Sequence, residues 1–148
     1  MPQIDKLLPQ DCQGDAAILD VTASRMTFDQ KTHTFLFEEK VHIRRCGMTI
    51  LCDRLQVISD AETEEVERII AMGNVRVQQG TRHIVAERAE YFTTEQRLVF
   101  TGNPRAWDAQ EQYEITGEEI VVFLAQEHVR VKRARVLFHP RTSTTKAP

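Results

Sequence analysis

The chain contains few of the residues that mark linkers, membrane spans or disulfide-rich folds. Its 148 residues include 6 Gly and 5 Pro, too few for a collagen-like or linker-rich protein. The longest apolar run, Ile120–Ala125, is much shorter than the roughly 18 residues that a membrane-spanning helix needs. Three cysteines are an odd number and do not form a disulfide framework. A single globular domain fits this length and composition.

Several classes of function are also poorly supported. A net charge of −3 and a pI near 6.0 argue against nucleic acid as a partner. The five histidines have no metal-ligand spacing, and no Ser/His/Asp or Cys/His arrangement or glycine-rich phosphate loop is present. We therefore predict no metal, no cofactor and no enzymatic activity.

The N-terminal sequence Met1–Asp5 lacks the basic start and apolar core of an export signal. The chain is thus either cytosolic or a mature form from which the signal has been removed. Among the cysteines, Cys46 and Cys52 are close enough in sequence to meet across a turn, which would leave Cys12 over. Cys52 stands at a small, inward-facing position, so we interpret it as a buried free thiol.

A short motif recurs at intervals of roughly 30 residues, the range typical of repeat architectures. Its copies are Ala23-Ser24-Arg25, Cys52-Asp53-Arg54, Ala86-Glu87-Arg88 and Gly117-Glu118-Glu119. Each follows an alternating apolar segment, and the alternation shifts by one residue after it. Because a β-bulge adds one residue and bends a strand, the motif predicts bent strands that keep one apolar face inward.

A second motif lies between these copies and predicts another bend. Gly73-Asn74-Val75 and Gly102-Asn103-Pro104 follow apolar strands, and Gly and Asn both tolerate positive φ. The first copy has Glu39-Lys40-Val41 instead. We therefore predict an all-β solenoid or jellyroll over residues 18–139, with a flexible N-terminal arm at residues 1–17 and a disordered tail at 140–148.

The motifs together resemble the LptA/OstA family of periplasmic lipopolysaccharide-transport proteins. The resemblance rests on Met48-Thr49-Ile50, Gly73-Asn74-Val75-Arg76-Val77, Ala86-Glu87-Arg88-Ala89 and Leu98-Val99-Phe100-Thr101-Gly102-Asn103-Pro104. It covers about residues 18–139, and the sequence departs from it at Glu39-Lys40 and in having three cysteines. The resemblance implies an open, twisted β-jellyroll whose apolar interior takes the acyl chains of lipid A.

The resemblance also implies location and partners. Members of the family stack end to end through their terminal strands and bridge the inner and outer membranes. Expected partners are therefore lipopolysaccharide, LptC-like and LptD-like β-jellyroll domains and further copies of this chain, in the periplasm. Whether the chain has the role of LptA, of LptC or of the N-terminal domain of LptD is left open.

The alternation and the resemblance together define a set of inward, lipid-facing candidates. These are Met26, Phe28, Phe35, Phe37, Val41, Ile43, Ile50, Leu55, Val57, Ile69, Val75, Val77, Ile84, Tyr91, Leu98, Phe100, Trp107, Ile120, Val122 and Leu124. Inward positions on the last strands are Ile115, Val129, Val131, Val136 and Phe138. The alternative for any one of them is packing against its neighbours.

Cations gather near the end of the repeat, at Arg130, Lys132 and Arg135. They are candidates for contact with lipid phosphates or sugar acids, and the alternative is a charged edge strand that prevents unwanted pairing. For the whole chain, two other functions compete with lipid transport. One is a filled β-solenoid scaffold that self-associates through edge strands, and a weaker one is a carbohydrate-binding β-helix.

Overall fold

The computed structural model describes residue 14 and residues 18–140, which contain twelve β-strands. The expected N-terminal arm and tail fall almost entirely outside these residues. Residues 18–140 form no helix, and no helix that could cross a membrane is found in the described part of the chain. The strands are β1 (Asp20–Thr22), β2 (Arg25–Asp29), β3 (Thr34–Arg45), β4 (Met48–Ser59), β5 (Val66–Gln79), β6 (Arg82–Phe92), β7 (Arg97–Thr101), β8 (Arg105–Asp108), β9 (Tyr113–Thr116), β10 (Glu119–Phe123), β11 (His128–Lys132) and β12 (Arg135–Phe138).

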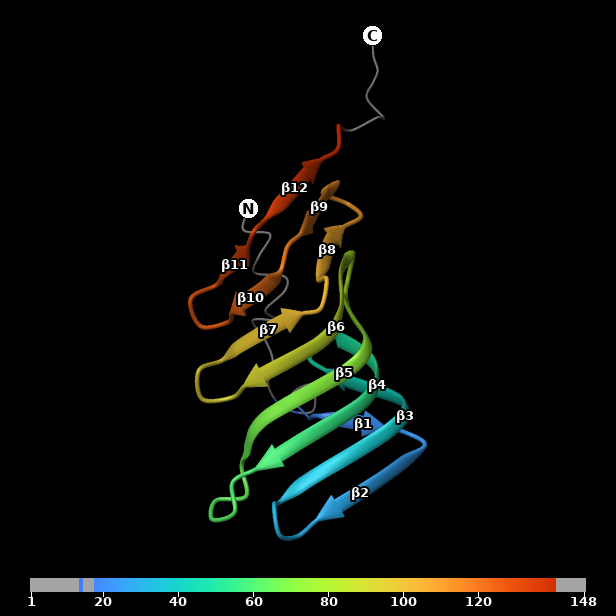
Figure 1. The fold of residues 1–148 in the computed structure, drawn as a ribbon, viewed down its shortest axis with the longest axis vertical. Helices are drawn as coiled ribbons and strands as arrows, with labels where there is room; N and C mark the ends of the chain where they lie inside the picture. The colour runs from blue at the N-terminus through green and yellow to red at the C-terminus, as the bar shows by residue number, and fades with distance from the viewer. Residues whose placement is uncertain (1–13, 15–17, 141–148) are drawn as a thin grey trace.

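All twelve strands belong to one antiparallel sheet that does not close on itself. Its main path is β1-β3-β4-β5-β6-β7-β10-β11, and β2, β8, β9 and β12 are attached beside it. The strands stack along the long axis of the molecule, with β2 at one end and β12 at the other (Figure 1). The predicted all-β, open jellyroll is therefore confirmed.

The long strands β3, β4, β5 and β6 each bend in the middle and so belong to two walls. The first wall consists of β2, residues 34–38, 54–59, 66–72 and 88–92, and then β7, β10 and β11. The second wall consists of β1, residues 41–45, 48–52, 75–79 and 82–86, and then β8, β9 and β12. The shifts in strand register fall between the two walls, as the repeated motifs predict.

The bends have the same backbone geometry in successive repeats. Gly73 and Asn74 have φ of 84° and 50°, and Gly102 and Asn103 have 81° and 54°. Glu39 and Lys40, with 69° and 55°, adopt the same left-handed conformation without a glycine. The first repeat is therefore bent like the others, and its departure in sequence changes the strain at the bend but not its shape.

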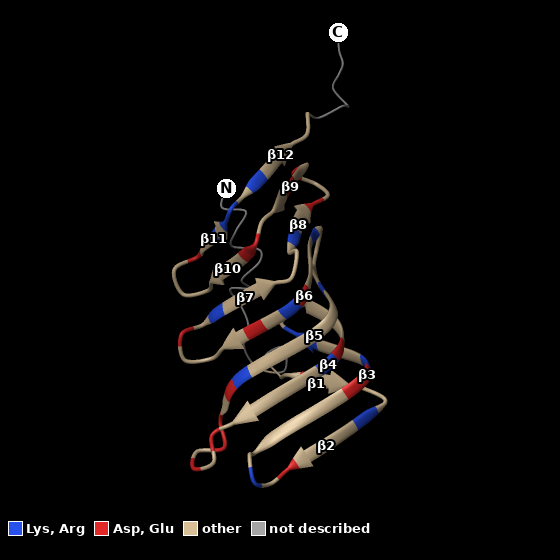
Figure 2. Ribbon diagram, in the orientation of Figure 1, with Lys and Arg blue, Asp and Glu red and all other residues tan. Residues whose placement is uncertain are grey.

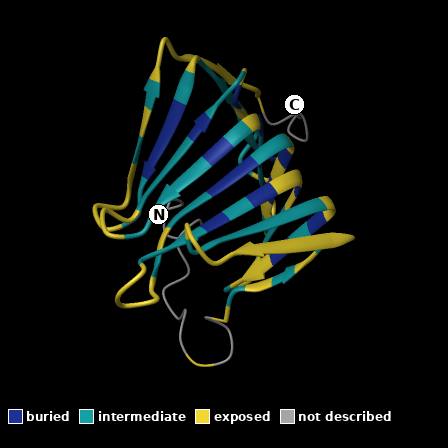
Figure 3. Ribbon diagram, turned by 60° about the horizontal axis from the view of Figure 1, so that its bottom comes forward, coloured by how far each residue is buried: buried dark blue, intermediate teal, exposed yellow. Residues whose placement is uncertain are grey.

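The core lies between the walls, because residues of both join one apolar cluster. Val41, Val75 and Ile84 of the second wall meet Leu55 and Phe100 of the first. Buried residues form bands across the middle of the strands, and exposure increases toward the strand ends and at the terminal strands (Figure 3). The inward phase of the alternation was thus predicted correctly for most strands.

Charged residues occur along most of the strands (Figure 2), and several of them form ion pairs between neighbouring strands. Arg25 and Arg54 both approach Glu38 on β3, at 3.9 and 3.8 Å. Arg88 instead pairs with Glu90 of its own strand at 3.3 Å. The corner arginines therefore form solvated pairs, each of which contributes little to stability.

Candidate functional site

An apolar crevice opens between the walls in the C-terminal half of the molecule. Its larger cavity has a volume of about 250 Å³ and lies between β6, β8 and β9 on one side and β10 and β11 on the other. Ile84, Ile115, Ile120, Val122 and Val129 are among its lining residues. Apolar side chains from both walls therefore surround a space that no side chain fills.

A narrower cavity of about 20 Å³ adjoins the first. Arg82, Ile84 and Val122 line both, so the two spaces are neighbours. Leu98 and Leu124 line the narrow cavity from the first wall. The crevice thus follows the interior toward the middle of the molecule, where the core closes it.

The structure divides the lipid-facing candidates into two groups. Ten are buried by their neighbours: Val41, Ile43, Leu55, Val57, Val75, Val77, Ile84, Phe100, Ile120 and Val122. Phe35, Phe37, Ile50, Ile69, Tyr91, Leu98 and Leu124 are half-buried, and Met26 and Phe28 are exposed. The buried group packs the walls together, and three of its members, Ile84, Ile120 and Val122, also line the larger cavity.

A row of large apolar side chains leads from the interior to the β2 end. Phe28 lies against Phe35 with ring centroids 4.5 Å apart, and Phe35 lies 6.4 Å from Phe37. Met26 continues the row, and it and Phe28 are 54% and 40% exposed. This end of the interior is therefore apolar and accessible.

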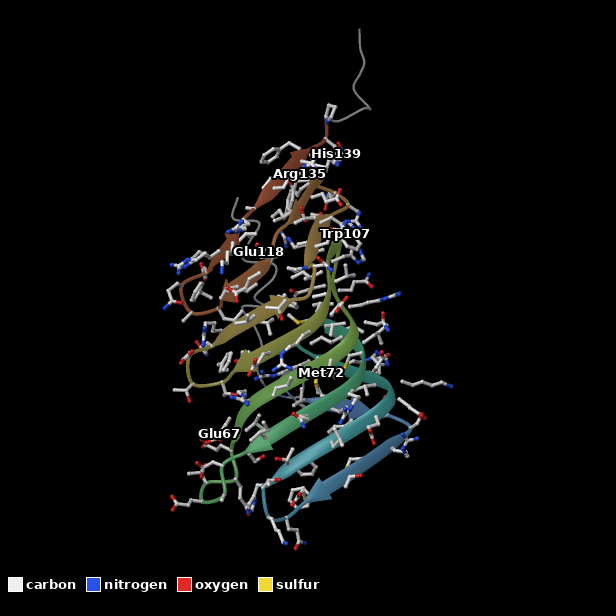
Figure 4. All side chains as sticks on the ribbon, viewed as in Figure 1. Glu67, Met72, Trp107, Glu118, Arg135 and His139 are labelled. Atoms are coloured by element: carbon white, nitrogen blue, oxygen red, sulfur yellow. The ribbon has the colours of Figure 1, made fainter. Side chains whose placement is uncertain are left out.

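The strand register places Trp107 on the outer face of the second wall, although Trp107 also lines the larger cavity. The register pairs Trp107 with His83 and Glu114, while its neighbours Ala106 and Asp108 pair with Ile84 and Tyr113. Trp107 (labelled in Figure 4) stacks on His83 with ring centroids 5.0 Å apart, and the Arg105 guanidinium lies 4.7 Å from its ring. Because adjacent residues of a strand face opposite sides, the inward position of Ala106 puts Trp107 outside.

The interior also holds a charged pair that the sequence reasoning missed. Arg82 and Asp108 are 5% and 3% exposed, and Arg82 Nε lies 3.2 Å from Asp108 Oδ2. Asp108 Oδ1 accepts hydrogen bonds from Thr81 Oγ1 and from the backbone N–H of Gln110 and Glu111. Burial raises the pKa of Asp108, but these hydrogen bonds and the charge of Arg82 outweigh it, so the pKa lies below its usual value.

The predicted headgroup cations lie away from the crevice. Arg130 and Lys132 alternate with the half-buried Val129 and Val131 on β11, and they are exposed. The Arg130 guanidinium lies 5.2 Å from the Phe123 ring on the outer face. Arg135 is exposed on β12 near the C-terminal end (Figure 4). These cations are thus on terminal strands, and their contact with a ligand stays a prediction.

The two described cysteines are in different states. Cys52 is a buried free thiol, as predicted, and burial, followed by the neighbouring Asp53 charge, raises its pKa to about 11. Cys46 is disulfide-bonded. Pairing between Cys46 and Cys52 is therefore excluded.

A wider hollow of about 590 Å³ lies outside the interior. Leu51, Arg76, Gln78, Val85 and Trp107 are among its lining residues, and they belong to the outer face of the second wall. Polar side chains such as Arg76 and Gln78 lie there among apolar ones. In the described part of the chain, no group of three or more His, Cys, Asp or Glu could hold a metal ion.

Comparison with known proteins identifies the family. The model of the family described as LptA/(LptD N-terminal domain) LPS transport protein matches residues 20–128. The chain belongs to this family. The repeat, the open sheet and the match over most of the chain confirm the resemblance that the sequence motifs indicated.

The structural comparison agrees with this membership. The structure of LptH from Pseudomonas aeruginosa, described as the LptA homologous periplasmic component of the lipopolysaccharide transport device, is similar with a TM-score of 0.72 and 15% identity. The similarity covers 84% of this chain and 96% of LptH. No curated protein sequence matches this chain. At this identity, the likeness to LptH shows a shared jellyroll fold.

Proposed function

We propose that this member of the LptA/LptD N-terminal family is a periplasmic carrier of lipopolysaccharide that shelters acyl chains between its two walls. The observation that supports this most is the crevice of about 250 Å³, which is lined by apolar side chains of both walls. Each methylene removed from water contributes about 0.8 kcal/mol. A chain of about a dozen carbons would thus contribute on the order of 10 kcal/mol before the costs of ordering are subtracted.

The shape of the sheet supports a role for the chain in a larger assembly. The edge strands β2 and β11 each pair with one neighbour only, and β12 pairs only with β9. Exposed apolar residues accompany them: Met26 and Phe28 at one end and Val136, Leu137 and Phe138 at the other. We propose that residues 18–139 act as one unit that stacks end to end with copies of itself and with LptC-like and LptD-like domains.

Native mass spectrometry with and without lipopolysaccharide tests the carrier. Leu98 and Val99 are adjacent on β7, both are half-buried, and Leu98 lines the narrow cavity while Val99 faces outward. We expect a mass shift of one lipid in the wild type and in Val99→Glu, and its loss in Leu98→Glu, since a buried carboxylate excludes acyl chains. Circular dichroism must show that both variants are folded.

One observation favours the filled scaffold as a second candidate. Leu55 and Phe100 have no exposed surface, so the middle of the interior is packed solid. A folded wild-type protein that binds no lipid at concentrations at which a known carrier does would support the scaffold and exclude the carrier.

A further inference from the structure

Arg82 and Asp108 are the two buried charged residues among residues 18–140, and they occupy the inner face of an otherwise apolar wall. Arg82 stands in phase with Ile84 on β6, and Asp108 is its cross-strand partner on β8. A buried ion pair gives little net stability compared with apolar side chains of the same size, because both ions lose their hydration. The pair therefore suggests a role in binding.

The position of Arg82 fits such a role. It lines the larger and the narrower cavity, together with Ile84 and Val122, so any chain lying in the crevice passes beside it. Its cross-strand partner Gln79 lines the narrow cavity, and the side-chain oxygen of Gln79 is buried without a hydrogen-bond partner in the structure. Tyr113, opposite Asp108, lines the larger cavity. The polar groups of the interior thus gather at one place.

Asp108 orients the arginine without being available to a ligand itself. Its Oδ1 accepts three hydrogen bonds at 2.8 to 3.2 Å, and its Oδ2 contacts Arg82 Nε. An arginine presents five N–H donors in a planar fork, a geometry that matches the oxygens of a phosphate. In an apolar setting such a charge-assisted contact is stronger than in water.

We propose that Arg82 is a specificity-determining residue that binds a phosphate on the headgroup of a lipid whose acyl chains lie in the crevice. This inference rests on the proposed carrier function and makes it more specific, since it assigns a polar anchor to the apolar site. Lipids with phosphorylated headgroups are then preferred over the same lipids without phosphate.

The test compares two ligands, lipid A and its dephosphorylated form, by displacement of a fluorescent acyl probe. We expect the wild type to bind the phosphorylated form about tenfold more tightly. Arg82→Gln should reduce this ratio to about one, because the phosphate loses its charged partner. Arg82→Lys should keep part of the preference, because lysine retains the charge without the fork.

A second variant controls for misfolding of Arg82→Gln. Arg82→Gln leaves Asp108 buried without its cation, so the double variant Arg82→Gln/Asp108→Asn, which has no buried charge, is measured beside it with thermal melts. If both variants melt earlier but keep the preference for phosphate, the pair is only structural and the proposal is overturned. A wild type that binds both lipids equally overturns it as well, although the carrier function survives.

Inorganic phosphate alone separates the two sources of the anion. One outcome is that inorganic phosphate binds the wild type but not Arg82→Gln, while the wild type binds both lipids equally. This result would assign the site to free phosphate and overturn the lipid proposal. If the wild type binds neither lipid, the carrier function itself is wrong. Failure of the inference and failure of the function are therefore distinguishable.

Discussion

At the scale of single residues, Asp108 connects the stability of the interior to pH. Its pKa is lower in the folded protein than in the unfolded chain, so the fold favours the carboxylate. The resulting stability is fully present above the pKa of the unfolded chain, about 3.9. It is lost as the pH falls through the lower pKa of the folded protein.

Asp108→Asn should therefore change the acid sensitivity of the protein. We expect the variant to be less stable than the wild type by about 1–3 kcal/mol at pH 7, because it loses charge-assisted hydrogen bonds. The difference should shrink below about pH 4, where the wild type loses the same contribution. Urea unfolding at pH 7, 5 and 3 measures it, and a difference that is constant across these pH values would contradict the assignment.

The sequence indicated the apolar residues of the interior but not its charges. Alternation identified Leu55, Phe100 and Ile120 as inward because each lies in a clear apolar-polar series. Arg82 and Asp108 begin and end strands beside turns, where polar residues are expected on either face. Trp107 lines the crevice but is out of phase with the inward Ala106, which its apolar character did not reveal. Only the strand register resolves such cases.

At the scale of the strand, the bends at Gly73 and Gly102 depend on the absence of a side chain. A Cβ on Gly73, at φ of 84°, would lie 2.6 Å from Asp53 Oδ2. Asp53 also accepts a hydrogen bond from Asn74 Nδ2 at 3.0 Å, so it cannot move without losing that contact. A Cβ added to Gly102 would likewise lie 2.6 Å from the Cβ of Glu87.

Gly73→Ala should therefore destabilise the protein more than replacement of a glycine at a turn by alanine. Gly80 is a matched control, since it also has positive φ, 61°, but nothing within 4 Å of an added Cβ. We expect Gly80→Ala to cost about 1 kcal/mol from backbone strain and Gly73→Ala about 1–3 kcal/mol more from the collision. Equal losses in chemical denaturation would show that the bend tolerates a side chain.

The first bend gives the opposite prediction. Glu39 has φ of 69° without being glycine, and its ion pair with Arg25 is exposed. Because glycine relieves the left-handed strain and the exposed pair is worth little, Glu39→Gly should raise stability by roughly 0.5–1 kcal/mol. A thermal melt measures this, and a lower melting temperature would mean that the side chain of Glu39 stabilises the bend.

The sequence predicted these bends because their motifs recur, and recurrence is visible without a structure. It did not predict that Glu39-Lys40 would adopt the conformation of Gly-Asn. The reason is that strand pairing on both sides of the bend overrides the local preference of two residues. Strand β3 pairs with β2 and β4 in the first wall and with β1 and β4 in the second.

At the scale of the whole molecule, the open ends predict association. Phe138 is 80% exposed on β12 and Met26 is 54% exposed on β2, and the two strands lie at opposite ends (Figure 1). If copies stack end to end, a cation at either position should oppose burial of the interface. We expect Phe138→Lys and Met26→Lys to shift the wild-type oligomers to monomers in analytical ultracentrifugation.

Leu51→Lys is the matched control for that shift. Leu51 is 43% exposed but lies on the outer face of β4, away from both ends. It should leave the oligomers unchanged. Loss of oligomers in Leu51→Lys alone, or a wild type that stays monomeric at high concentration, would contradict end-to-end stacking.

The central claim is that lipid lies between the walls, and site-specific photocrosslinking tests it most directly. A photoreactive phenylalanine analogue replaces Val129, which lines the larger cavity, or His128, its neighbour on the opposite face of β11. With lipopolysaccharide present, we predict crosslinking from position 129 and none above background from position 128. Equal crosslinking from both positions, or crosslinking from position 128 alone, would place the lipid on the outer surface and contradict the account.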